Sequence, residues 1–305
     1  MPEQFLHGVE VVEIDTGTRP IRTVRSAVIG LVGTAPNADA ARFPLNTPVL
    51  IAGKRSDAVG LGADGTLAPA IDDIFDQVGA VVVVVRVDEG VDDAGTLSNV
   101  IGGTDLVTGL PEGVQALLAA ESVVKVAPRI LIAPAFTQNA ALVTEMVAVA
   151  EKLRGIIVAD GPNSTDADAI TYRGLFGSDR IWLIDPWVRV WDTASSTEIV
   201  RSVSARAAGV IAKSDAERGF WHSPSNRLID GITGSARPID FTLGDATSRA
   251  NILNENEVTT IIQRDGFRLW GNLQHAPELR AGGRYAGSAR RGAPRTDGRR
   301  RAGTH

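Results

Sequence analysis

The side chains that most often carry out catalysis are scarce in this chain. It contains no cysteine and only four histidines among 305 residues, which excludes a thiolate zinc site, a disulfide framework and a cysteine nucleophile. His7 lies near the amino end, and His275 and His305 lie in a terminal region of biased composition. His222 is therefore the one histidine that we expect inside a folded domain.

A Ser-His-Asp arrangement around His222 would need a nucleophile and a carboxylate. Ser223 or Ser225 could supply the hydroxyl, and Asp160 or Asp185 could supply the carboxylate. However, the chain has no Gly-x-Ser-x-Gly motif, which in many hydrolases places the nucleophile on a sharp turn. We expect His222 to be a packed or loop residue, and we predict no catalytic residue.

One glycine pattern has the spacing of a cofactor-binding motif. The segment Gly60-Leu-Gly62-Ala-Asp-Gly65 matches G-x-G-x-x-G, precedes a predicted helix and is followed by a strand that ends at Asp88. In a dinucleotide-binding turn the first glycine directly follows a strand, so that backbone amides meet the pyrophosphate. Here six residues separate Gly53, at the end of the preceding predicted strand, from Gly60. We interpret the segment as a surface loop and expect no cofactor; a dinucleotide-dependent enzyme that uses it, with Asp88, is the alternative function.

Acidic side chains gather in two places, and either group could hold a hard cation. Asp72, Asp73 and Asp76 lie on a predicted helix, where Asp72 and Asp76 share one face that we expect to be solvated. The second group, within residues 88–93, lacks the spacing of a calcium loop. We therefore predict no metal site.

The net charge of −5 conceals two opposed regions. Residues 275–305 hold eight arginines against Glu278 and Asp297, a local charge of +6, so the rest of the chain carries −11. An acidic body argues against nucleic-acid binding, because phosphate neutralisation needs clustered Lys and Arg. The longest aliphatic run, Ala80–Val85, is too short to span a membrane. We expect a soluble protein without either partner; nucleic-acid binding through the arginine-rich tail is a third hypothesis.

Hydrophobic periodicity predicts alternating strands and helices. Predicted strands cover residues 5–14, 27–32, 49–52, 81–85, 129–133, 155–160 and 180–185, with a closing hairpin of 257–262 and 267–270; predicted helices cover 67–78, 138–153, 166–175 and 198–213. We expect Thr137 to cap the 138–153 helix, Gly155 to end it, and residues 88–112 to form a loop. This is the pattern of an α/β protein whose mainly parallel sheet is covered on both faces.

Six sequence blocks follow one another in the second half of the chain. They are Gly219-Phe-Trp-His-Ser-Pro-Ser-Asn226, Gly231-Ile-Thr-Gly234, Ala236-Arg-Pro238, Leu253-Asn-Glu-Asn256, Val258-Thr-Thr-Ile-Ile262 and Gly266-Phe-Arg-Leu-Trp-Gly-Asn272. Upstream, Phe5–Glu10, Ile29–Ala35 and Val81–Val87 fit the same pattern. With these blocks, residues 1–272 resemble the tail sheath proteins of contractile phage tails, in particular those of P2-like phages and R-type pyocins.

The resemblance implies a subtilisin-like, Rossmann-type α/β sandwich that lacks the protease triad. We accordingly divide the chain into an N-terminal arm (1–20), a smaller mixed α/β region (21–92), a subtilisin-like core (93–272) and a divergent tail (273–305). The resemblance also implies a structural protein and no enzyme.

Assembly is the function that the resemblance implies. Family members stack as six-subunit rings that form a helical sheath around a tail tube, together with a baseplate, and terminal arms add strands to the sheets of neighbouring subunits. Contraction drives the tube through a cell envelope. In the arm of this chain Val9, Val11 and Ile14 form the expected pairing face. The expected location is the virion tail, after assembly in the host bacterial cytoplasm.

The match ends after Asn272. Arg, Gly, Ala and Pro make up 22 of the 31 residues from 275 to 305, a composition that predicts disorder. Family members continue for roughly a hundred residues, the length of a separate domain. Because these four residue types have GC-rich codons and the chain holds 27 Arg against 4 Lys, we predict an out-of-frame reading of the downstream DNA in a C-terminally truncated form. Translation of the other two frames after Asn272 would test this.

Overall fold

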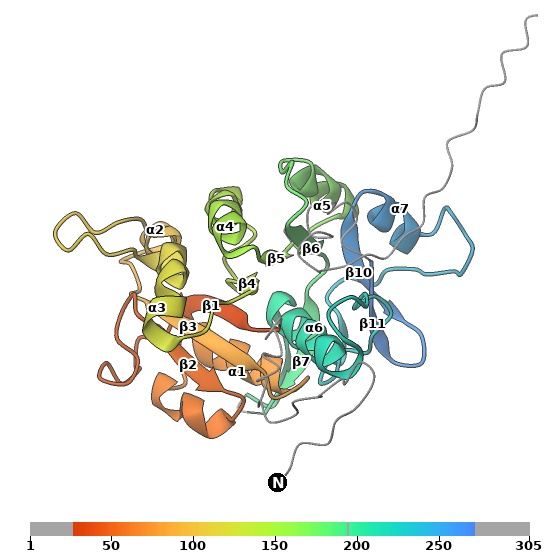
Figure 1. Ribbon diagram of the computed structural model, residues 1–305. Coiled ribbons are helices and arrows are strands. Elements are labelled where there is room, and N and C mark those ends of the chain that lie inside the picture. The colour runs from red at the N-terminus through yellow and green to blue at the C-terminus, as the bar shows by residue number, and fades with distance from the viewer. Residues whose placement is uncertain (1–26, 194, 272–305) are drawn as a thin grey trace, which may run out of the picture.

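The computed structural model describes residues 27–193 and 195–271 (Figure 1). The predicted strand over residues 5–14, the assembly face of Val9, Val11 and Ile14, and the tail from residue 273 lie outside the described residues.

One eight-stranded sheet forms the centre of the described chain. Its strand order is β11-β10-β6-β5-β4-β1-β3-β2. The bounds are β1 Ile29–Thr34, β2 Pro48–Ala52, β3 Val81–Val87, β4 Ile130–Ile132, β5 Ile156–Asp160, β6 Ile181–Ile184, β10 Val258–Gln263 and β11 Phe267–Trp270. Five neighbouring pairs are parallel, and only the outer pairs β2–β3 and β10–β11 are antiparallel. The mainly parallel sheet and its closing hairpin were both predicted.

Helices cover both faces of this sheet (Figure 1). α1 Leu67–Phe75 and α6 Ser204–Arg218, with the 3-10 helix η1 Arg55–Leu61, pack on one face. The other face is covered by α2 Asp93–Ile101, η2 Gly113–Ala119, α3 Ala120–Val124, α4 Ala140–Leu153, α5 Asp166–Arg173 and α7 Arg249–Glu255.

The valine run of β3 shows how the sequence specifies this arrangement. Val82 and Val84 enter the hydrophobic core on the face that α1 and α6 cover, whereas Val83 and Val85 enter the core on the opposite face, where η2 packs against β3. Successive side chains of a strand point to opposite faces, so a continuous run of β-branched residues fits a strand that is buried on both sides.

Two elements differ from the sequence predictions. Residues 88–112 contain α2, although a loop was expected; Asp92 caps this helix by accepting a hydrogen bond from the Gly95 amide at 2.6 Å. The predicted helix over 198–213 was wrong in its first part. Residues Thr197–Arg201 form strand β8, which pairs with β7 Val188–Asp192 in a second sheet of order β8-β7-β9, where β9 is Gly234–Ser235.

The ends of α4 also differ from the prediction. Asn139 is the N-cap, and its side chain accepts a hydrogen bond from the Ala141 amide. Thr137 lies two residues earlier, where its hydroxyl bonds to Asp160 instead. At the other end Arg154, with φ of 51°, adopts the left-handed conformation that was expected of Gly155.

The single sheet spans the division that we predicted at residues 92 and 93. β1 pairs with β3 on one side and with β4 on the other, so both proposed regions contribute to one set of hydrogen-bonded strands. Within the described residues, no helix is long and apolar enough to cross a membrane.

Candidate functional site

The carboxyl ends of β5 and β6 are the first place to look for chemistry. In open α/β sheets ligands bind at the carboxyl ends of the strands, and here Asp160 ends β5 while Asp185 follows β6. Both side chains are fully buried. They are also the two carboxylates that could have joined a triad with His222.

Asp160 is saturated with hydrogen-bond donors. Its Oδ1 accepts from the backbone amides of Val203 and Ser204, at 2.8 and 2.7 Å. Its Oδ2 accepts from the hydroxyls of Ser204 and Thr137, at 2.6 and 3.2 Å. Burial raises the pKa of Asp160, and these hydrogen bonds act in the opposite direction. The carboxylate therefore serves to hold the start of α6 against the end of β5.

Asp185 belongs to an ion-pair cluster that sequence analysis did not identify. Arg237 donates to Asp185 Oδ1, and the Asn163 amide donates to Oδ2 at 2.8 Å. The same guanidinium contacts Asp166 at 2.8 Å, and Arg249 contacts Asp166 at 2.7 Å. Burial raises the pKa of Asp185, whereas at Asp166 the opposing hydrogen bonds from the two arginines outweigh burial and lower the pKa. We call Asp166, Asp185, Arg237 and Arg249 the edge cluster.

His222 does not form a catalytic triad with Asp160 or Asp185. His222 is exposed, in a turn where its amide donates to the Gly219 carbonyl and its ring lies 6.1 Å from that of Trp221. Both carboxylates have other donors, so the described residues around His222 do not assemble a charge relay.

The Gly60–Gly65 segment has a structural role. The 3-10 helix η1, and not a strand, leads into it. Gly65 has φ of +87°, and a Cβ there would lie 2.4 Å from the Thr34 carbonyl oxygen. Thr66 closes this contact, because its amide donates to the Thr34 carbonyl and its hydroxyl accepts from the Thr34 amide. The glycine lets the loop pack on the end of β1. Asp88 is exposed, and its backbone carbonyl accepts from the Asn99 side chain.

The acidic residues of α1 form salt bridges. Asp72 is solvated as expected, but Asp73 is buried, and it is contacted by Arg206 of α6 at 2.6 Å and by Arg201 of β8 at 3.4 Å. Arg206 also contacts Asp76 at 3.1 Å. Burial raises the pKa of Asp73 to about 6, although both arginines oppose this shift. Among the described residues no group of His, Asp or Glu side chains has the arrangement of a metal site.

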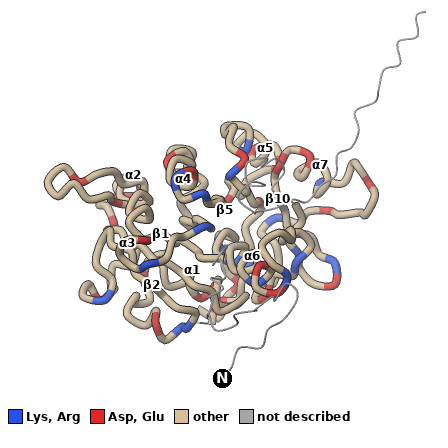
Figure 2. Tube along the Cα trace, in the orientation of Figure 1, with Lys and Arg blue, Asp and Glu red and all other residues tan. Residues whose placement is uncertain are grey.

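The remaining candidates are contact surfaces. Figure 2 shows acidic and basic residues interspersed along the described chain, which does not resemble a basic stripe for nucleic acid. Large apolar side chains are exposed instead. Leu106 and Val107 are 100% and 94% exposed at the loop after α2, and Trp191, Val200 and Trp221 are each about half exposed. An association surface needs a contiguous apolar patch, and the adjacent Leu106 and Val107 are the candidates that lie next to each other in the sequence.

Comparison with known proteins identifies the family. Residues 109–273 match the family model of the phage tail sheath protein central domain, and residues 26–87 match that of the domain III N-terminal region of tail sheath protein Gp18. A prophage major tail sheath protein of Pseudomonas aeruginosa strain UCBPP-PA14 is 45% identical over 269 residues, which cover 88% of this chain and 69% of the relative. The tail sheath protein of Escherichia phage P2 is 43% identical over 276 residues, with the same coverage.

A solved structure shares the fold. The helical sheath of the anti-feeding prophage in its contracted state superposes with a TM-score of 0.58 at 20% identity, covering 87% of this chain and 68% of that one. The resemblance predicted from the sequence blocks is thereby confirmed. The chain belongs to the phage tail sheath family, whose members are structural proteins and not enzymes.

Proposed function

We propose that this chain polymerises as six-subunit rings stacked in a helical sheath around a tail tube, and that contraction of the sheath drives the tube through a cell envelope. Its partners are then further copies of the chain, the tube protein and the baseplate. The assembled protein is located in the virion tail, after synthesis and assembly in the host bacterial cytoplasm.

The 45% identity to a prophage major tail sheath protein is the observation that supports this proposal most directly, and the carboxyl edge of the sheet argues against the enzyme alternative. Asp160 and Asp185 occupy the position where an α/β enzyme would bind its substrate, and both are fully buried and bonded to structural donors. The exposed apolar residues, by contrast, are suited to contacts between copies.

The finer architecture is part of the proposal. We assign the sheet and its two helical layers to a subtilisin-like sandwich without the protease triad. We also retain the division into an arm (1–20), a mixed region (21–92), a core (93–272) and a divergent tail (273–305). In the arm, Val9, Val11 and Ile14 pair with the sheet edge of a neighbouring copy, since an exposed edge strand readily adds another strand.

Electron microscopy of the purified chain tests the proposal. We expect rings or tubes that increase with protein concentration, because mass action favours association. A chain that remains monomeric at every concentration would contradict self-assembly. In parallel, a titration with NAD examines the enzyme alternative: saturable binding that is lost in Gly62→Val would support it, and we expect no such binding.

A further inference from the structure

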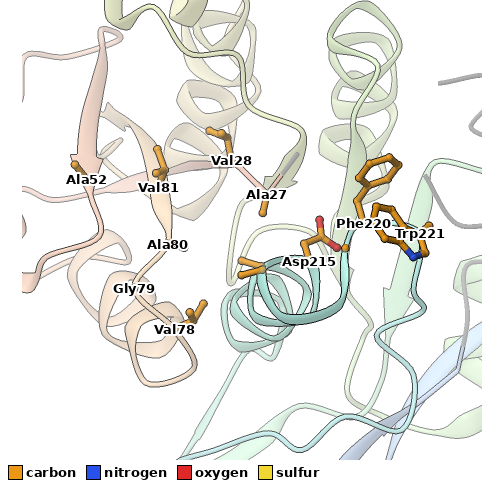
Figure 3. Close-up of a pocket in the computed structure, with 13 residues that line it drawn as sticks. Ala27, Val28, Ala52, Val78, Gly79, Ala80, Val81, Asp215, Phe220 and Trp221 are labelled. Atoms are coloured by element: carbon orange, nitrogen blue, oxygen red, sulfur yellow. The ribbon is translucent and has the colours of Figure 1, made fainter. Parts of the chain in front are cut away.

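A groove of about 800 Å³ opens at the amino end of the central sheet, and Figure 3 shows the residues that line it. One side is formed by the approach to β1 and by the end of β2 and start of β3, including Ala27, Ala52 and Val81. The other side is formed by the last turn of α6 and the aromatic residues that follow it, including Ala216, Phe220 and Trp221. Its lining is mainly apolar.

The aromatic side of the groove is built into a fixed shape. Gly219 ends α6 with φ of +90°, and a Cβ there would lie 2.4 Å from the Trp221 ring. The Phe220 and Trp221 rings pack edge to face with centroids 5.2 Å apart, a favourable geometry for aromatic pairs. Trp221 is nevertheless 58% exposed. A preformed apolar wall with an open indole is suited to covering by another apolar segment.

The first described residues of the chain line the groove, and this indicates which segment covers it. Ala27 and Val28 line the groove themselves, and the residues just before them are Pro20-Ile-Arg-Thr-Val-Arg-Ser26. Six residues span at most about 20 Å, so a segment of this length that directly precedes Ala27 is long enough to cover the groove. Such a short tether corresponds to an effective concentration in the roughly millimolar range, which favours this segment over a second copy at ordinary protein concentrations.

The chemistry of the segment matches the groove. Ile21 and Val24 are β-branched apolar residues, and Arg22 and Arg25 follow them. The groove offers mainly apolar walls. We propose that residues 21–26 dock in this groove of their own chain, with Ile21 and Val24 against Phe220 and Trp221. This contact anchors the preceding residues to α6 and β1, so that a pull on the arm is transmitted to the core of the subunit.

A cysteine pair tests this docking in the dilute subunit, independently of polymerisation. The chain has no cysteine, so Val24→Cys with Ala216→Cys introduces the only two thiols, and Ala216 is exposed. The matched control combines Val24→Cys with Val107→Cys on the loop after α2. We expect the first pair to form an intramolecular disulfide at least about tenfold faster than the control, at a rate independent of concentration, because proximity sets the effective concentration. Equal rates, or cross-linking only between two chains, would overturn the proposal.

A second measurement does not depend on disulfide geometry. Val24→Asp places a charge against the apolar wall, whereas Thr23→Asp adds the same charge at the neighbouring position. We expect acrylamide to quench the Trp221 emission more strongly in Val24→Asp than in Thr23→Asp, with the contribution of Trp221 obtained by difference from Trp221→Phe. Equal quenching in both variants would show that the groove is not covered by this segment. Neither experiment requires rings or tubes, so its outcome is separate from that of the proposed function.

Discussion

At the scale of single residues, close backbone contacts explain two of the glycines that have the spacing of a cofactor motif, Gly62 and Gly65. In Gly65→Ala the new Cβ would meet the Thr34 carbonyl oxygen at 2.4 Å, at a backbone φ of +87°. We expect a loss of about 1 to 3 kcal/mol in the free energy of unfolding, measured by urea titration. Gly103→Ala is the control, because nothing lies within 4 Å of its added Cβ; a similar loss in both variants would contradict this explanation.

The edge cluster makes a prediction about acid stability. The arginines lower the pKa of Asp166 in the folded protein, so its contribution to stability is present above the unfolded pKa of about 4 and is lost as the pH falls through the folded value. Urea unfolding between about pH 5 and pH 2 should therefore show a shallower loss of stability in Asp166→Asn than in the parent chain. Asp265→Asn, at an exposed turn, should retain the parent's slope. An unchanged slope in Asp166→Asn would refute the assignment.

Only part of this site could be predicted at the residue scale. Asp160 and Asp185 were considered as carboxylates that could join a triad with His222, and both lie at the carboxyl ends of strands. The edge cluster around Asp166 was not predicted, because Arg237 and Arg249 lie far along the chain from Asp166 and no local spacing links them. Contacts across 71 and 83 positions depend on the tertiary fold, which hydrophobic periodicity does not specify.

At the scale of elements, helix α6 depends on a residue from another element. Asp160 accepts the Val203 and Ser204 amides at the start of α6, and no side-chain hydrogen bond caps this helix at Val203 itself. Asp160→Asn keeps the shape but replaces one accepting oxygen with a donor. We expect the free energy of unfolding to fall by about 3 kcal/mol, and hydrogen exchange to quicken first in α6.

The exposed Asp88 supplies the control for that variant. Asp88→Asn should change the free energy of unfolding by less than about 0.5 kcal/mol, as expected of a surface substitution. A small effect of Asp160→Asn, equal to that of Asp88→Asn, would show that the buried carboxylate does not hold the helix.

Elements with strong periodicity were predictable, and the failures have physical causes. β3 and α4 were placed nearly correctly because valine runs and a 3.6-residue apolar stripe leave few alternatives. α2 was missed because Gly95, Thr96, Ser98 and Asn99 are weak helix formers, and tertiary packing through buried Val100 outweighs that preference. β8 was assigned to a helix because its apolar residues continue the pattern of α6 without a break by glycine or proline.

At the scale of the whole molecule, substitutions in the loop after α2 should impair assembly and leave the stability of the subunit unchanged. Leu106 and Val107 are almost fully exposed, so Leu106→Ser with Val107→Ser should leave the urea midpoint unchanged. If this loop contacts a neighbouring copy, as its apolar character suggests, the double variant needs a higher concentration to form polymers in sedimentation assays. Thr104→Ser, near the base of the same loop, should behave like the parent chain. Unimpaired polymerisation of the double variant would exclude the loop from the contact.

The N-terminal residues provide the decisive prediction for the proposed sheath. The sheet and both helical layers are built from residues 27 onward, so deletion of residues 1–20 should leave a folded monomer with the circular dichroism and urea midpoint of the parent chain. Polymerisation should nevertheless be lost, because Val9, Val11 and Ile14 would no longer add a strand to a neighbour. A chain that carries Asp at these three positions tests the same face without shortening the arm. Normal polymers from both variants would refute the proposed role of the arm. They would not affect the family membership, because the residues that match the family models begin at position 26.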